Sequence, residues 1–205
     1  EAEDGIRVYD VTGVKTCAIL ISVRQTTDGG YILTGYKEFN TTYKDVYLIK
    51  TDSSGNTLWT KTYGGVGVDE GKSVRQTTDG GYIIVGTKAT STDVGDGVWL
   101  LKTDSLGDTL WTKVFTATGD FGNGSNGESV QQTTDGGYII AGTIYENSVG
   151  DLWLIKTDSQ GNEEWTQTFG GSDNDYGHSV QQTTDGGYII AGTTRWPAGN
   201  WDGIL

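Results

Sequence analysis

The side chains that most often carry catalysis are scarce in this sequence. It contains one histidine, His178, and one cysteine, Cys17, which excludes a Cys/His zinc site and a disulfide within the chain. His178 occupies the position that Lys72 and Glu128 hold in two similar segments, and this variation indicates a surface residue. Cys17 lies in an apolar segment, where we expect a buried inert thiol or, as the alternative, an intermolecular disulfide.

Carboxylates are plentiful, with 27 aspartates and glutamates. Most recur at equivalent turn positions, whereas a catalytic acid/base pair needs two unlike environments. We therefore predict that they shape turns, and we predict no catalytic residue, no cofactor and no firm metal site. Two weak candidates for calcium remain because this ion takes oxygen ligands, although neither has the full EF-hand spacing. They are Asp93 with Asp96, and Asp173 with Asp175.

The turns that these carboxylates mark belong to four repeats of one sequence. The segment Thr-Thr-Asp-Gly-Gly-Tyr-Ile occurs four times, and its aspartates are separated by 51, 56 and 50 residues. We place the repeats near 22–72, 73–128, 129–178 and 179–205, with residues 1–21 completing the last. Residues 1–205 are thus expected to form a single domain.

Each repeat reads as short strands joined by turns. Ser-Val-Arg/Gln-Gln alternates apolar and polar residues, Tyr-Ile-Ile is β-branched and apolar, and two further strands follow. Within the turn, the aspartate can accept backbone hydrogen bonds and the glycines can supply positive φ. Four strands per unit of about 50 residues are typical of a β-propeller blade. The predicted fold is an all-β, four-bladed β-propeller with four antiparallel strands in each blade.

The two ends of the chain are expected to complete one blade. Residues from Trp201 onward fall in a third strand, and the segment from Ile6 through Val8 to Val11 reads as an outer strand. We predict that this first strand pairs with the blade that contains Ile204 and Leu205, which would remove open sheet edges. The pairing could occur within one chain or between two chains.

The tryptophans fall into two groups. Five recur with the repeat and are expected to pack between blades, namely Trp59, Trp99, Trp111, Trp153 and Trp165. Trp196 and Trp201 belong to the last repeat alone. An exposed pair of this kind could stack on sugar rings or anchor a protein partner, and packing beneath the closing strand is the alternative.

The segments from Asp52 to Trp59, Asp104 to Trp111 and Asp158 to Trp165 resemble the strand–turn–strand signature of quinoprotein-type tryptophan-docking repeats. They also resemble the Asp-box hairpin of sialidase-like propellers, although that hairpin is shorter. The whole repeat resembles a propeller repeat of exported bacterial and archaeal proteins. The resemblance implies the fold and implies no catalytic residue, because fold alone does not fix function.

The net charge, the length of the apolar runs and two short motifs bear on the class of protein and its location. A formal net charge of −13 disfavours nucleic-acid binding, and the sequence has no apolar run of the length of about 20 residues that a membrane helix needs. Asn40 and Asn123 begin N-glycosylation sequons in variable loops, which favours an extracellular or cell-surface location.

These observations favour a non-catalytic structural or adhesion protein that assembles with itself, forming filaments by strand exchange between subunits. The alternative is a module that binds glycans or surface proteins through the loops of one face. A glycosidase or lyase is the third hypothesis, and it requires unlike carboxylates close together on the propeller axis.

Overall fold

The computed structural model describes residues 18–39, 43–89, 97–116, 124–146, 149–195 and 201–204. This part of the chain folds into antiparallel β-sheets and contains no helix. A search of it for a helix long and apolar enough to cross a bilayer found none.

Each repeat of the sequence folds into one sheet, whose strands pair in chain order. Sheet 1 contains β1 (Ala18–Gln25), β2 (Tyr31–Glu38), β3 (Lys44–Thr51) and β4 (Thr57–Tyr63). Sheet 2 contains β5 (Glu70–Gln76), β6 (Tyr82–Lys88), β7 (Gly97–Thr103) and β8 (Thr109–Phe115). Sheet 3 contains β9 (Asn126–Gln132), β10 (Tyr138–Glu146), β11 (Val149–Thr157) and β12 (Glu163–Phe169). Sheet 4 contains β13 (Asp175–Gln182), β14 (Tyr188–Arg195) and β15 (Trp201–Ile204).

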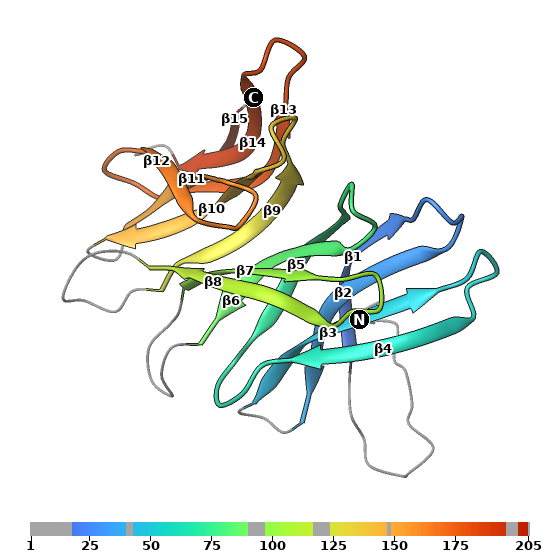
Figure 1. Cartoon of the computed structure of the whole chain (residues 1–205). Coiled ribbons are helices and arrows are strands. Elements are labelled where there is room, and N and C mark those ends of the chain that lie inside the picture. Colours follow the sequence, from blue (N-terminus) through green and yellow to red (C-terminus); the bar gives the residue numbers. More distant parts are fainter. Residues whose placement is uncertain are drawn as a thin grey trace.

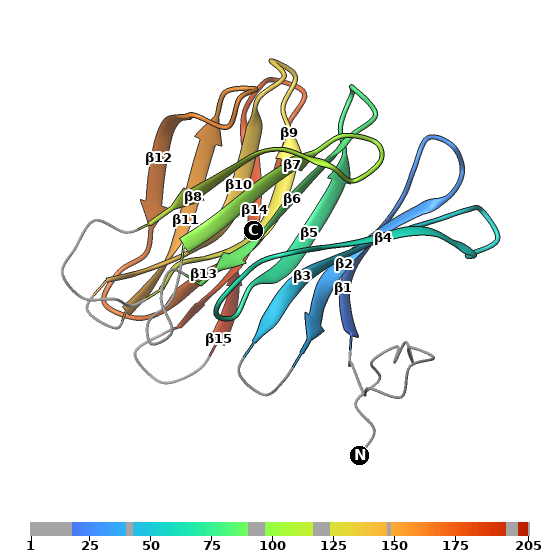
Figure 2. The same cartoon turned by 60° about the horizontal axis from the view of Figure 1, so that its bottom comes forward.

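The sheets pack face to face in the order in which they occur in the chain, with sheets 1 and 4 at opposite ends of the series (Figure 1). Neighbouring sheets meet mainly at the first strand of the later sheet, which lies against the first two strands of the sheet before it: β5 against β1 and β2, β9 against β5 and β6, and β13 against β9 and β10. The turns between first and second strands follow one edge of sheets 1, 2 and 3 (Figure 2). Each sheet can therefore bury an apolar face on the next, as a blade does in a repeat array.

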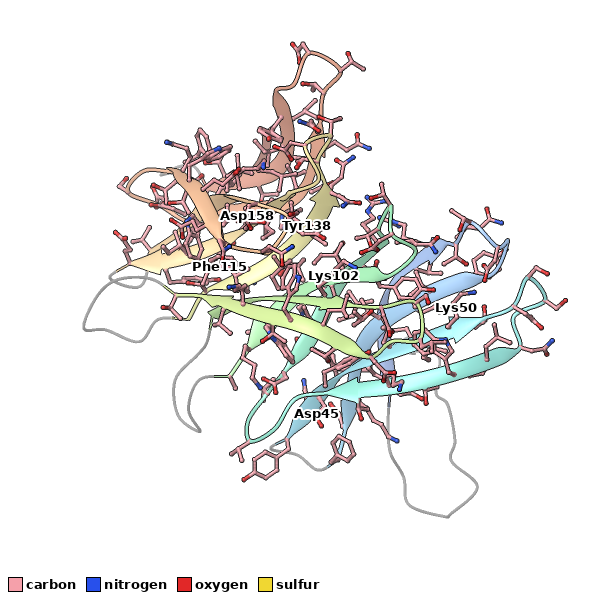
Figure 3. The ribbon with its side chains drawn as sticks, in the orientation of Figure 1. Asp45, Lys50, Lys102, Phe115, Tyr138 and Asp158 are labelled. Carbon is pink, nitrogen blue, oxygen red and sulfur yellow. The ribbon has the colours of Figure 1, made fainter. Side chains whose placement is uncertain are left out.

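Three apolar clusters fill the three junctions between sheets. At the first junction, Ile32 and Leu48 of sheet 1 pack with Val74 and Leu101 of sheet 2. The second junction includes Phe115 and Tyr138, which Figure 3 labels. The third contains residues of β10, β11 and β13. The five recurring tryptophans join these clusters as predicted. The rings of the three on fourth strands meet a tyrosine of the next sheet at 5.8–5.9 Å between centroids, in the pairs Trp59–Tyr82, Trp111–Tyr138 and Trp165–Tyr188.

The two glycines of each Asp-Gly-Gly turn have different roles, and the prediction that both supply positive φ is wrong. Gly80 has a φ of 84°, in the left-handed region that favours glycine. Gly81 does not, but a Cβ there would lie 2.2 Å from the carbonyl oxygen of Thr103. The second glycine is therefore required by the close approach of the third strand.

The expected all-β fold is confirmed, with four strands in each of the first three sheets. In the described residues, β15 is the third strand of sheet 4 and pairs only with β14. Sheets 1 and 4 share no hydrogen-bonded strands there, and the expected four-bladed propeller is not confirmed. Ile6, Val8, Val11 and Leu205, which were expected to close the last blade, lie outside the described residues.

Candidate functional site

Polar side chains gather along the first strands of sheets 2 to 4, where the sheets converge. Each first strand carries a β-bulge, because one residue there has no partner on the second strand. The bulge residues are Lys72, Glu128 and His178. A glycine lies beside each bulge on the second strand, and a Cβ on Gly86 would lie 1.8 Å from the carbonyl oxygen of Glu70. The bulge and the glycine together place a variable side chain on each converging strand.

Glu70 is held as a carboxylate by two lysines. Its Oε1 lies 2.9 Å from Lys44 Nζ of sheet 1, and its Oε2 lies 2.8 Å from Lys72 Nζ. Burial acts to raise the pKa of Glu70, but the hydrogen bonds from Lys72 and Lys44 outweigh it, so that the pKa lies below its ordinary value. This group also joins sheet 1 to sheet 2.

The pKa of Glu128, on sheet 3, is shifted in the opposite direction. Burial raises the pKa of its carboxyl group, although the positive charge of Lys72 and the proximity of His178 act against this rise. Asn126 Nδ2 donates to Glu128 Oε1 at 2.9 Å. Two carboxyl groups with opposite pKa shifts thus lie on adjacent first strands, and each interacts with Lys72.

The bulge residue of sheet 4 is His178. The His178 side chain is exposed, and its Nε2 lies 3.1 Å from Thr193 Oγ1 of β14. The rings of Tyr145 and Tyr176 meet at 6.5 Å between centroids on the same junction of sheets 3 and 4. Along the first strands, positive, acidic and aromatic groups therefore follow one another from sheet 2 to sheet 4. The prediction that position 178 is a variable surface position is confirmed.

A second set of charged residues has a structural role that sequence reasoning missed. In each of the first three sheets, a lysine near the end of the third strand is buried and forms an ion pair with the aspartate of the Asp-Gly-Gly turn. Lys50 and Lys102 are labelled in Figure 3, and 5% and 4% of their side chains are exposed. The recurrence of Lys-Thr-Asp in three repeats was the available signal.

The described calcium candidates lie at the start of sheet 4. Asp175 is buried at the start of β13, and Asp173 precedes it in a bend. Asp151 of sheet 3 is close enough to Asp175 for its pKa to be raised, first by burial and then by that second carboxylate. At the equivalent place between sheets 1 and 2, Asp69 is instead paired with Lys88. The described ranges contain no group of three or more His, Cys, Asp or Glu side chains able to hold a metal, and calcium binding stays a prediction.

The remaining predicted site residues are described only in part. Trp196, Asn40, Asn123, Cys17, Asp93 and Asp96 lie outside the described residues. Trp201 and Ile204 contribute backbone pairing in β15. The predictions made for these side chains therefore stay predictions.

Comparison with known proteins adds no assignment. No protein-family model matches this sequence, and no curated protein matches it either.

Proposed function

We propose that this chain is a non-catalytic structural or adhesion protein of the cell exterior that assembles with copies of itself. In this proposal the sheets are blades of a β-propeller-type array, and subunits join by donating a strand. The single observation that supports it best is the edge of sheet 4. In the described residues this sheet has three strands where the others have four, and β15 pairs on one side only. An unpaired strand edge is a template for a strand from another chain.

The order of strands in the chain indicates which segment would be donated. The fourth strand of each complete sheet directly precedes the first strand of the next, as β4 precedes β5 and β8 precedes β9. By the same order, the segment that precedes β1 is suited to be the fourth strand of another subunit's sheet 4. The strand-like segment from Ile6 to Val11 lies in this part of the sequence.

The experiment is light scattering and electron microscopy of the full chain over a range of concentrations. We expect open-ended assemblies, and the double change Val8→Pro, Tyr9→Pro should abolish them, because successive N–H groups of a strand point to opposite sides and one of these two would face β15. The double change Ala2→Pro, Glu3→Pro, outside the proposed strand, is the matched control and should assemble normally. Dispersed monomers of the unaltered chain at high concentration would overturn the proposal.

A second candidate function, cleavage of a glycosidic bond, has one observation in its favour. Glu70 and Glu128 lie on the neighbouring first strands β5 and β9, each interacts with Lys72, and their pKa values are shifted in opposite directions, as a base and an acid of such an enzyme require. The test is an assay against a panel of polysaccharides, with Glu128→Gln as the inactive variant and Glu163→Gln, on an outer strand, as the control. If no polysaccharide is cleaved by the unaltered chain, this candidate is excluded for the panel.

A further inference from the structure

We propose that the outer face of sheet 4 in one copy of this chain binds the outer face of sheet 1 in a second copy, in the register that joins consecutive sheets within the chain. The inference rests on the proposed self-assembly and identifies the surfaces that meet. It follows from the repetition of one junction three times and from the residues of that junction that sheets 1 and 4 expose in the described part of the chain.

A junction between sheet 4 of one copy and sheet 1 of another needs an apolar residue on each face, and both residues are exposed. Within the chain, the isoleucine that follows the turn tyrosine packs in the same cluster as a valine from the first strand of the next sheet. These isoleucines are 0% exposed and the valines 0–1%, in the pairs Ile32–Val74, Ile83–Val130 and Ile139–Val180. The fourth isoleucine, Ile189, is 52% exposed, and the first valine, Val23, is 49% exposed. Sheet 4 thus exposes the isoleucine side of such a junction, which is its receiving face, and sheet 1 exposes the valine side, which is its docking face.

A recurring hydrogen bond fixes the register of each junction. The backbone N–H of a turn threonine donates to the side-chain oxygen of a glutamine at the end of the next sheet's first strand. The distances are 2.8–2.9 Å in the pairs Thr27–Gln76, Thr78–Gln132 and Thr134–Gln182. Gln25 holds the same position in sheet 1, and its Nε2 donates to the carbonyl of Gly29 as Gln76 does to Gly80.

Sheet 4 carries the donor group of this hydrogen bond and sheet 1 carries the acceptor group. Within the described part of the chain, the Oε1 of Gln25 accepts no hydrogen bond, and the N–H of Thr184 has no glutamine facing it. Thr184 of one copy and Gln25 of the next are therefore matched as donor and acceptor. The register that brings Ile189 onto Val23 also brings these two groups together, since both pairings recur at every internal junction.

A second copy is the occupant that these observations favour. In the described residues, sheets 1 and 4 of one copy lie at opposite ends of the series and share no hydrogen-bonded strands (Figure 1). A contact between two different faces of identical subunits is heterologous, and it generates open chains unless its rotation closes a ring. Each copy carries a net charge of −13, so the contact should strengthen as salt screens the repulsion between copies.

The contact between copies should be weaker than the internal junctions. Internal junctions also carry a tryptophan from the fourth strand, such as Trp111 against Tyr138. Sheet 4 has no fourth strand among its described strands, so its face offers no such ring to Tyr31, the equivalent tyrosine of sheet 1. We therefore expect association that depends on protein concentration.

The test is sedimentation velocity of the full chain and two variants. Val23→Lys disables the docking face of sheet 1, and Ile189→Lys disables the receiving face of sheet 4. Each should raise the concentration needed for half-assembly by about tenfold or more, because a lysine ammonium would be buried in an apolar contact. Leu110→Lys is the matched control, since Leu110 is 57% exposed on the internal sheet 2, and it should leave assembly unchanged.

Mixing the two variants provides the decisive result. The Val23→Lys chain keeps its sheet 4 face and the Ile189→Lys chain keeps its sheet 1 face, so the mixture should form dimers that grow no further. Circular dichroism checks that both variants fold. Assembly of both variants at the concentration that suffices for the unaltered chain would overturn this inference while leaving self-assembly in place. An unaltered chain that stays monomeric would overturn both.

Discussion

Lys102 Nζ lies 2.8 Å from Asp79 Oδ2 and 3.0 Å from the carbonyl oxygen of Thr103, with 4% of the lysine side chain exposed. The same aspartate accepts hydrogen bonds from the Thr77 hydroxyl and the Gly81 amide. The ion pair thus ties the turn between the first and second strands to the end of the third strand. Removing the carboxylate would leave a buried ammonium without its charge partner, which is costly.

The first prediction compares Asp79→Ala with Asp185→Ala by urea unfolding. Both changes remove the turn hydrogen bonds, but in the described residues Asp185 has no lysine partner. Asp79→Ala should lower the free energy of unfolding by about 2–3 kcal/mol, a range reduced because the carboxylate itself is largely exposed. Asp185→Ala should cost about 1 kcal/mol. Equal losses would contradict a stabilising role for the lysine.

The second prediction concerns acid pH. The pKa of Asp79 is lowered to about 2, because hydrogen bonds from Lys102, Thr77 and Gly81 outweigh the effect of burial, which acts to raise it. The pKa of Asp135 is likewise lowered to about 2, chiefly by hydrogen bonds from Thr133 and Lys156. A carboxyl whose pKa is lower in the folded chain than in the unfolded chain stabilises the fold above the unfolded value. That contribution should be lost as the pH falls from about 4 to about 2.

Urea unfolding at a series of pH values checks this expectation. The unaltered chain should lose stability steeply over that interval, and a variant with Asp79→Asn and Asp135→Asn should show a shallower slope. A slope that is the same for both proteins would contradict the assignment of the acid sensitivity to these two turns.

Repetition explains why much of the fold could be predicted from the sequence. The spacing of the Asp-Gly-Gly turns placed the strands, and the alternation around Val74 and the apolar run after Tyr82 identified the buried ones. The recurring tryptophans identified contacts between sheets, because a large ring at the same place in each repeat needs the same neighbour. Local patterns do not fix how far successive sheets rotate, and closure into a ring therefore could not be deduced.

The candidate site was much less predictable. The position of His178 was known to vary, but alternating sequence does not show that its side chain lies at a bulge beside those of neighbouring sheets. The buried lysines were missed because Lys102 reads as a polar strand end, and its partner, Asp79, is 23 residues away in the chain. Both relationships depend on contacts between strands that only the register fixes.

The third prediction concerns the second glycine of the turn and compares Gly137→Ala with Gly187→Ala. A Cβ on Gly137 would lie 2.1 Å from the carbonyl oxygen of Thr157, on a backbone that cannot move freely. A Cβ on Gly187 would meet nothing closer than the Thr183 hydroxyl at 3.1 Å. Thermal and urea unfolding should show a loss of about 2–3 kcal/mol for Gly137→Ala and less than about 1 kcal/mol for Gly187→Ala. The reverse order would contradict the close approach of the third strand.

The fourth prediction concerns the hydrogen bond that sets the register between sheets, and it compares Gln132→Ala with Gln25→Ala. Gln132 accepts from the Thr78 amide at 2.9 Å and donates to Gly136, whereas among the described residues Gln25 makes only the donation, to Gly29. At concentrations where the chain is dissociated, Gln132→Ala should lower the free energy of unfolding by about 1 kcal/mol more than Gln25→Ala. Both variants lose the same side chain from the same strand position, so the difference reports on the contact between sheets that Gln132 makes, including its greater burial. Equal stabilities would show that apolar packing alone holds neighbouring sheets in register.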